Sequence, residues 1–426
     1  MKRIVAMILA AFMLLTATSA LADIEDFPAE VNWPEMVDLG NYMKTVFPGA
    51  HRMKVADGEK EYTAVAYIGE NYSQYQPLVV IIPDSQMTAE QVLDQGGWAT
   101  VADANDLLLL IMDSAGAYDQ SKDGDTYAQI NATFKAAASK TYFTKSKGSN
   151  FVVGYGDAAG LTTAAVEAAL PGAWAGLVTF GDMDLAVADV ENKDGTELPI
   201  WMFVSELDKE AELVELFKGY NACTDEAFSN ADADYIYFPN QQVNDLQMNN
   251  QRMSQVRVTV AEDAAALNAQ RTAAAFDFLK MGSRMVGYGN AKMGYARTLE
   301  DWGATIETLE VDGVNRFWVQ YVPTSLRETA EGKAPLLVVM HGGALNAVYF
   351  AERTQMIRLA EDRGFIVVFP NGSINPARGQ GTTWNNKKAE DQWDDVKFIT
   401  EMVEHLKDTL PVTLPAATAM AIPWAA

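Results

Sequence analysis

The sequence predicts an α/β protein in which a largely parallel sheet is flanked by helices, and it predicts this pattern twice along the chain. Unbroken apolar runs of strand length, such as residues 77–82 and 335–340, are typical of strands buried on both faces of a sheet. Stretches with helical periodicity separate these runs. The third observation is that the same order of strands and helices starts again after residue 294.

In the first half of the chain, strand and helix patterns alternate at the spacing of βαβ units. We expect strands at residues 62–68, 77–82, 107–112, 150–156, 174–180, 198–204 and 234–238. We expect helices at residues 36–46, 89–105, 127–138, 158–169, 210–220 and 263–279. The rest of residues 23–58 is interpreted as a lead-in with turns at its prolines.

The second half repeats the pattern over fewer elements. We expect strands at residues 316–322, 335–340 and 365–369, and helices at residues 349–363 and 394–406. The last helix begins with two acids at its positive end. Its predicted apolar face consists of Val396, Ile399, Met402, Val403 and Leu406.

The recurrence indicates an internal duplication. Residues 77–112 align with residues 335–370 without a gap, so that strand falls on strand and Asp103 falls on Glu361. In this alignment His341 falls on Pro83, and the two following glycines fall on Asp84 and Ser85. The first repeat therefore lacks the His-Gly-Gly turn of the second.

Residues 1–22 have the features of a secretory signal peptide. Lys2 and Arg3 precede an apolar run that ends in Ala20-Leu21-Ala22, an A-x-A cleavage site. No later apolar run approaches the ~20 residues that a membrane span needs. We therefore expect an exported, extracellular bacterial protein with no membrane association after cleavage.

Charge and composition narrow the range of partners and cofactors. The formal net charge is −25 and becomes −27 when Lys2 and Arg3 are removed, so the surface repels nucleic acid and anionic membranes. Cys223 is the only cysteine, which excludes an internal disulfide. The three histidines are far apart and the acidic turn at 123–125 lacks further calcium ligands, so no metal site is expected.

Residues 335–343, PLLVVMHGG, carry the most specific signal in the chain. The glycines after His341 let the backbone turn sharply where a buried strand ends. Backbone N–H groups exposed by such a turn can point at an oxyanion. A tight turn without catalytic meaning remains the alternative for this motif alone.

Further motifs accompany this turn in the second repeat. They are YVP at 321–323, LAEDRGFIVVFPNG at 359–372, TTWNN at 382–386 and DDVKFITEMVEHL at 394–406. With these motifs the second repeat resembles the polyhydroxybutyrate-depolymerase-like esterases, which include feruloyl and acetylxylan esterases, and the first repeat resembles a diverged member. The resemblance implies an α/β-hydrolase fold, a Ser, Asp, His triad with Ser in a GxSxG elbow, and an ester polymer or plant-polysaccharide ester as substrate. It implies no cofactor.

Matching the family residue by residue leaves no complete site. In the first repeat the elbow falls on residues 154–158, where Gly154, Gly156 and Ala158 stand for the two glycines and the nucleophile, with Gly156 at the nucleophile position. Asp208 stands where the acid belongs, but no histidine follows it before His341. Loss of nucleophile and base costs on the order of 10⁶ in turnover. Asp157 could substitute as nucleophile, although a surface acid is the simpler interpretation.

In the second repeat the oxyanion-loop candidates are His341, Gly342 and Gly343, and the pattern stops before an elbow. Residues 411–426 are interpreted as neither strand nor elbow, and His405 as a helical residue. Codons read from the last base of the preceding one give glycine at 420–421 and at 424–425, and the three codons between them allow His, Ser and Met, so that GHSMG is a permitted reading. A chance match remains the alternative, because only the two glycines are obligatory. We therefore expect a frameshift at about Val412.

The expected organisation is a signal peptide at 1–22, a degenerate first domain at 23–282, a linker at 283–294 and the N-terminal half of a second domain at 295–426. The expected function is that of a secreted ester hydrolase that is catalytically incomplete. The alternative is a secreted module that binds a polymer or glycan. Its aromatic candidates, which could equally be core residues, are Trp98, Tyr155, Trp174 and Trp201.

Overall fold

A computed structural model of the chain describes residues 24–31, 47–72, 76–113, 116–119, 121, 124–137, 142–143, 145–146, 148–163, 173–185, 190, 197–231, 233–239, 253–284, 293–295, 298–329, 332–343, 345–374, 382–385 and 393–421. The predicted signal peptide, the helix expected at 36–46 and most of the helix expected at 158–169 lie outside these ranges. Within them, no helix is long and apolar enough to cross a membrane.

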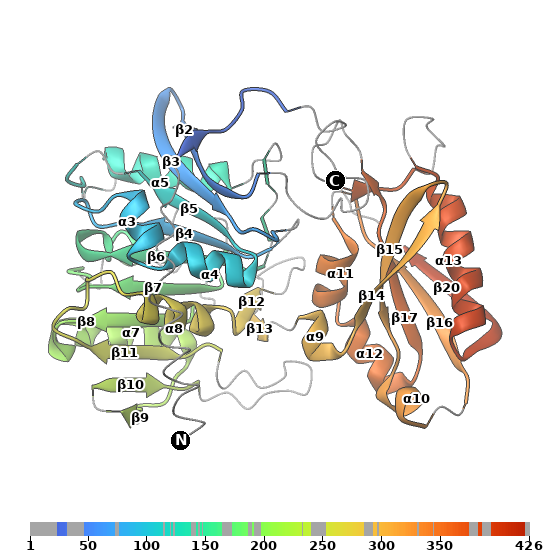
Figure 1. Cartoon of the computed structure of the whole chain (residues 1–426). Coiled ribbons are helices and arrows are strands. Elements are labelled where there is room, and N and C mark those ends of the chain that lie inside the picture. The colour runs from blue at the N-terminus through green and yellow to red at the C-terminus, as the bar shows by residue number, and fades with distance from the viewer. Residues whose placement is uncertain are drawn as a thin grey trace, which may run out of the picture.

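The first sheet lies in the first domain and has eleven strands in the order β1-β2-β3-β5-β4-β6-β7-β8-β11-β10-β9 (Figure 1). The strands from β5 to β11 in this order are mutually parallel, and antiparallel strands flank them. The bounds are β1 Glu25–Asp26, β2 Gly49–Asp57, β3 Lys60–Ile68, β4 Leu78–Ile82, β5 Leu108–Met112, β6 Asn150–Tyr155, β7 Gly176–Phe180, β8 Ile200–Val204, β9 Phe228–Ala231, β10 Asp234–Tyr237 and β11 Val256–Val260.

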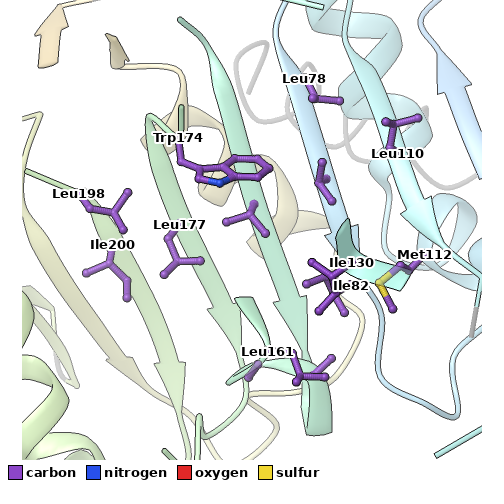
Figure 2. Packing of buried hydrophobic residues seen from close by; sticks show 14 of the residues in the cluster. Leu78, Ile82, Leu110, Met112, Ile130, Leu161, Trp174, Leu177, Leu198 and Ile200 are labelled. Carbon is purple, nitrogen blue, oxygen red and sulfur yellow. The ribbon is translucent and has the colours of Figure 1, made fainter. Parts of the chain in front are cut away.

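Helices cover both faces of this sheet, because alternate residues of its central strands point to opposite sides. Leu78, Val80 and Ile82 pack on one side with α5 and α7 (Figure 2), whereas Val79 and Ile81 pack on the other with α3, α4 and α8. The predicted α/β class is therefore confirmed. The bounds are α3 Ala89–Asp94, α4 Trp98–Asn105, α5 Asp125–Ala136, α7 Ala211–Asn221 and α8 Ala269–Leu279.

The second sheet has five strands in the order β14-β15-β17-β16-β20, with α11 and α12 on one face and α13 on the other. The strands are β14 Thr305–Val311, β15 Val314–Tyr321, β16 Ala334–Met340, β17 Ile366–Pro370 and β20 Val412–Ala421. The helices of this half are α9 Leu299–Trp302, α10 Thr324–Thr329, α11 Ala347–Arg353, α12 Met356–Arg363 and α13 Asp395–Thr409.

Strand β20 corrects the interpretation of the tail. It pairs in parallel with β16, so the expectation that residues 411–426 contain no strand is wrong, and the strand before His341 is paired on both sides. Two prolines near the start of this segment do not interrupt the ladder. Pro411 precedes β20, and Pro415 lies within the register shift between Val412 and Ala417, where proline is tolerated.

Two helices that were expected to be continuous are broken. The break between α3 and α4 and the break between α11 and α12 fall at aligned positions of the two repeats. There Gly97 and Gln355 both have positive φ, 75° and 59°. A residue with left-handed backbone interrupts helical geometry. In the second repeat this residue is not a glycine, so the sequence did not indicate the break.

The apolar face of α13 also differs from the prediction. Met402 and Leu406 are buried, but Val396 is 52% exposed and Phe398 takes the buried position in the first turn. Phe398, Met402 and Leu406 recur every four residues and follow the buried Asp395. Ile399 and Val403 are partly buried against the same core, so four of the five predicted residues lie on the packed face, and the prediction is wrong only in including Val396 and omitting Phe398.

Three smaller differences concern segments between the predicted elements. The lead-in at 23–58 contains β2, and the helix expected from residue 263 begins only at Ala269, capped by the Asn268 side chain. Both ends of the predicted linker at 283–294 belong to a two-stranded sheet, formed by β12 Gly282–Arg284 and β13 Met293–Tyr295.

The two sheets repeat the same pairing register. Leu78 pairs with Leu108 as Leu336 pairs with Ile366, which are the positions that the gap-free alignment matches. The hydrogen bonds between Tyr67 and Asp103 and between Tyr321 and Glu361 also repeat. These matches support the proposed duplication.

Candidate active site

The elbow of the first domain has the backbone geometry of a nucleophile turn. Strand β6 ends at Tyr155, and Gly156 then adopts a φ of 54° at the start of a single 3₁₀ turn. A Cβ atom on Gly154 would lie 2.5 Å from Thr162 Cγ2 and 2.8 Å from Ala158 O. Glycine at 154 therefore lets the following turn pack against the strand.

The space above the elbow is filled by a side chain from the turn after β4. A Cβ atom on Gly156 would lie 1.8 Å from Asp84 Oδ2, so a serine cannot occupy this position while Asp84 keeps its place. The same oxygen accepts a hydrogen bond from Asp157 N at 3.1 Å. In a hydrolase of this geometry, the amide after the nucleophile is one of the two oxyanion donors.

The second donor is occupied in a reciprocal way. Ser85 N, in the turn after β4, donates to Asp157 Oδ1 at 2.9 Å, and Ser85 Oγ donates to Asp157 Oδ2 at 2.5 Å. Each segment thus binds the carboxylate of the other through its own amide. An incoming oxyanion would meet two negative charges and no free donor from these two amides.

Small residues surround the elbow where a triad would stand. A Cβ atom on Gly181, which follows β7, would lie 3.2 Å from Gly156 Cα and 3.4 Å from Ala265 Cβ. Ala265, in the segment after β11, therefore lies close to this turn. Within the described part of the first domain the only histidine is His51, which lies in β2 and contacts Pro48 O.

Asp208, the predicted remnant acid, lies exposed on the 3₁₀ turn Leu207–Glu210. The carboxylates that join the loops after β7 and β8 are instead Asp182 and Glu210. Asp182 accepts from Ser205 N at 2.7 Å and from Lys209 Nζ at 3.0 Å. Partial burial acts to raise the pKa of Asp182, but these hydrogen bonds hold it below its usual value. Its position directly after a buried strand was the signal that sequence reasoning missed.

The turn after β16 is built differently. His341 is buried, and its Nε2 accepts a hydrogen bond from Gly372 N at 2.9 Å. Nδ1 therefore carries the proton and donates to Gly342 O at 2.8 Å. Burial lowers the pKa of His341 to about 4, so the ring is neutral and orients the turn that contains Gly342 and Gly343.

The motifs that follow this turn in sequence hold it from the other side. Trp384 Nε1 donates to His341 O at 2.7 Å, and the two ring centroids lie 4.8 Å apart. A Cβ atom on Gly372 would lie 2.3 Å from Thr383 O, so only glycine permits this close approach. The PNG and TTWNN motifs therefore act as supports of the His-Gly-Gly turn.

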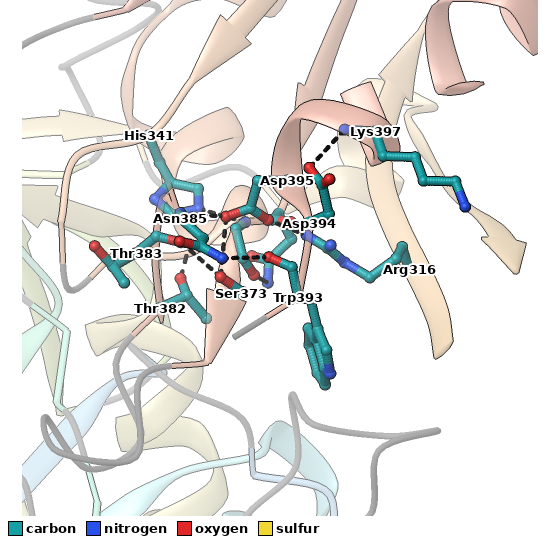
Figure 3. A network of polar contacts seen from close by, with 12 residues as sticks. Arg316, His341, Ser373, Thr382, Thr383, Asn385, Trp393, Asp394, Asp395 and Lys397 are labelled. Carbon is teal, nitrogen blue, oxygen red and sulfur yellow. Dashed lines mark hydrogen bonds and ion pairs between the residues drawn. The ribbon is translucent and has the colours of Figure 1, made fainter. Parts of the chain in front are cut away.

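A buried polar network lies beside this turn (Figure 3). Asp395 Oδ1 accepts from Arg316 Nη2 at 2.5 Å, and its Oδ2 accepts from Ser373 Oγ at 2.9 Å and from Asn385 N at 2.6 Å. Both members of the ion pair are almost fully buried, and Arg316 also contacts the Phe398 ring. One carboxylate thus connects β15, β18 (Ser373–Ile374), the TTWNN segment and α13.

The described part of the second domain ends where an elbow would begin. Ala421 pairs with Met340 in β16, as Gly154 pairs with Ile82 in β4. Residues 422–426 lie outside the described ranges. His405 is exposed on α13 with its ring 5.9 Å from that of Trp318, so it is not directed at the turn after β16.

No protein-family model and no curated protein matches the sequence. Among solved structures, an acetyl xylan esterase from Aspergillus awamori is 13% identical with a TM-score of 0.40, and the match covers 54% of this chain and 98% of that one. A ferulic acid esterase is 19% identical with a TM-score of 0.22, covering 28% and 48%. A dienelactone hydrolase-like promiscuous phosphotriesterase from metagenomic libraries is 13% identical with a TM-score of 0.35, covering 54% and 96%. Such distant likenesses do not assign an activity.

Proposed function

We propose that this chain is an exported protein of ester-hydrolase descent whose first domain does not hydrolyse esters. The observation that carries the proposal is the pair of reciprocal hydrogen bonds by which Asp84 and Asp157 occupy both amides at the elbow. Gly156 keeps the left-handed backbone of a nucleophile position but has no side chain to react. The backbone of the site has been retained while its chemistry has been lost.

We further propose that the second domain carries the oxyanion turn of a polyhydroxybutyrate-depolymerase-like esterase. The neutral His341, held by Gly372 and Trp384, supports this because it fixes the turn without adding charge. The substrate class would be an ester polymer or a plant-polysaccharide ester. Hydrolysis through an acyl-serine needs no cofactor.

The pairing of β20 supports the proposed frameshift near Val412. The shifted codon formed by the last base of Met420 and the first two bases of Ala421 encodes glycine. In the ladder, Ala421 lies opposite Met340, which is the place that Gly154 has in the first sheet. Sequencing the coding DNA around Val412 tests this, and an uninterrupted frame in independent isolates would contradict it.

The alternative of a polymer-binding module loses its aromatic candidates. Trp98 and Tyr155 are fully buried and hydrogen-bonded to each other, and Trp174 and Trp201 are only 2% and 4% exposed. These rings form the core of the first domain and cannot stack on a sugar or polymer. No other described feature favours this function.

Labelling of the full chain with a serine-directed fluorophosphonate tests the proposal. We expect no labelling and no nitrophenyl-ester turnover by the natural chain. We expect the same for Gly156→Ser compared with Gly156→Ala, because the only histidine in the described part of the first domain is His51, which lies in β2. Turnover by Gly156→Ser above the alanine control would mean that a base exists elsewhere.

A further inference from the structure

Arg353, at the end of α11, connects the second domain to the part of the chain before it. Arg353 Nη2 donates to Ser149 Oγ at 2.5 Å, and Arg353 Nη1 donates to Ser283 Oγ. Ser149 precedes β6, and Ser283 lies in β12, so both acceptors belong to the part of the chain before the second domain. Figure 1 shows α11 on the side of the second sheet that faces β12 and β13.

The receiving site is buried and is formed by the first domain together with β12, which begins at its last residue. Ser149 is 3% exposed and Ser283 is fully buried. Arg284 fixes β12 against the amino ends of the strands, because its backbone N donates to Gly148 O at 2.7 Å and its Nε to Trp174 O at 2.6 Å. This site lies at the amino ends of the strands, whereas the elbow lies at their carboxyl ends.

The contact is particular to the second repeat. In the gap-free alignment Arg353 falls on Gln95, which is exposed in the first repeat. Arg353, in contrast, is partly buried, and its Nε has no hydrogen-bond partner among the described residues. Moving a charged guanidinium out of water costs free energy unless hydrogen bonds in the protein replace those to water. The hydroxyls of Ser149 and Ser283 supply such hydrogen bonds.

We propose that the catalytically empty first domain serves as a structural scaffold for the second domain, which binds the amino edge of the first sheet through Arg353. The partner of this surface is the chain's own second domain. The second sheet has five described strands against eleven in the first. The larger sheet can stabilise the smaller one through this arginine without any active-site residue.

Hydrogen exchange of the full chain tests this scaffold role. Ser149→Ala/Ser283→Ala changes no residue of the second domain. We nevertheless expect it to lower the protection of amides in β16 and β17 at least tenfold, with β3 and β5 unchanged within twofold. Arg353→Met should give the same result. Arg363→Met, at the exposed end of α12, is the matched control and should change neither. Unchanged exchange of β16 and β17 in the serine variant would overturn the proposal.

A double-mutant cycle on the same chain separates docking from local effects. The cycle compares Ser149→Ala/Ser283→Ala, Arg353→Met and the triple variant that combines them. If Arg353 acts through the serines, the triple variant should be no less stable than the less stable of the first two variants. The coupling should change the unfolding constant at least tenfold, or 1.4 kcal/mol. Losses that simply add would mean that Arg353 stabilises only its own helix and would also overturn the proposal.

Discussion

The turns after β4 and β16 occupy the same place in two sheets that share one pairing register, yet their chemistry is opposite. In the first, Asp84 and Asp157 turn their carboxylates onto the amides at the elbow. In the second, His341 is neutral and hydrogen-bonded to the backbone on both sides. The backbone hydrogen bonds from Met87 N to Asp84 O and from Leu345 N to Gly342 O fall at aligned positions, so the two turns share a local backbone pattern while their side chains differ.

The two turns also differ in how they are held. Half-buried side chains of the turn and the exposed Asp157 hold the first one, whereas a fully buried network beside the second one supports it. Exposed carboxylates contribute little to stability, but breaking a buried ion pair is costly. The comparison predicts that the second turn is the more sensitive to substitution.

The largest effect should come from Asp395→Ala. It leaves Arg316 charged and buried without its carboxylate, at a cost of about 3 to 5 kcal/mol in the unfolding free energy of the second domain. Asp394→Ala is the matched control, because Asp394 only caps α13 at Lys397 N and should cost about 1 kcal/mol. Denaturant unfolding followed by near-ultraviolet dichroism measures both. Equal losses would contradict the role assigned to the network.

The second effect is a pH dependence that His341 introduces and the first turn lacks. Burial lowers the pKa of His341 from 6.5 to about 4, so the unfolded chain binds this proton more readily than the folded one. Stability of the second domain is therefore full above pH 6.5 and falls as the pH drops toward 4. The total loss is about 3 kcal/mol.

Glu352 acts in the opposite direction and must be removed from this measurement. Burial raises its pKa from 4.5 to about 7, so that its contribution weakens the fold as the pH rises through this window. Unfolding should be compared in Glu352→Gln and in Glu352→Gln/His341→Gln. The first should lose stability on acidification, and the second should not. Parallel pH profiles would mean that His341 is not held neutral.

A third experiment concerns the carboxylate above the first elbow. Gly156→Ser should cost about 2 kcal/mol, because a non-glycine residue is strained at a φ of 54° and its Cβ would meet Asp84 Oδ2. Asp84→Gly in the same chain should recover about half, since it removes the contact but not the strain. Thermal unfolding of the two single variants and the double variant measures this. If Asp84→Gly recovers none of the lost stability, the Asp84 side chain does not fill the space above Gly156.

The sequence predicted most strands of both sheets because buried parallel strands leave unbroken apolar runs, as at residues 77–82 and 335–340. Strand β14 was missed because it lies at the edge of its sheet and its two glutamates and two threonines leave no apolar run. Strand β20 was missed because residues 411–426 have no long unbroken apolar run, and a register shift accommodates Pro415 within the strand. Backbone pairing, which decided both cases, has no signature in composition.

The candidate sites were predictable to different degrees. Alignment alone indicated that Asp84 and Ser85 replace the glycines of the second turn. It did not reveal that Asp84 reaches Asp157 N, because the contact joins residues far apart in the chain. Asp208 was chosen from a motif, but a 3₁₀ turn directs it to solvent. Arg353 carried no signal at all, since its partners lie in the other domain.

The smallest effect should be the same in both repeats. Tyr67 donates to Asp103 at 2.9 Å and Tyr321 donates to Glu361 at 2.6 Å, and burial raises the pKa of both phenols. Tyr67→Phe and Tyr321→Phe should each cost about 1.5 kcal/mol, the lower range for a hydrogen bond to a charged group. Neither tyrosine has a catalytic role. The loss in unfolding free energy should therefore depend only on the supporting structure that the two repeats share. Hydrogen exchange of β5 and β17 measures the two losses separately. A large difference between them would mean that the repeats have diverged in their supporting structure as well as in their turns.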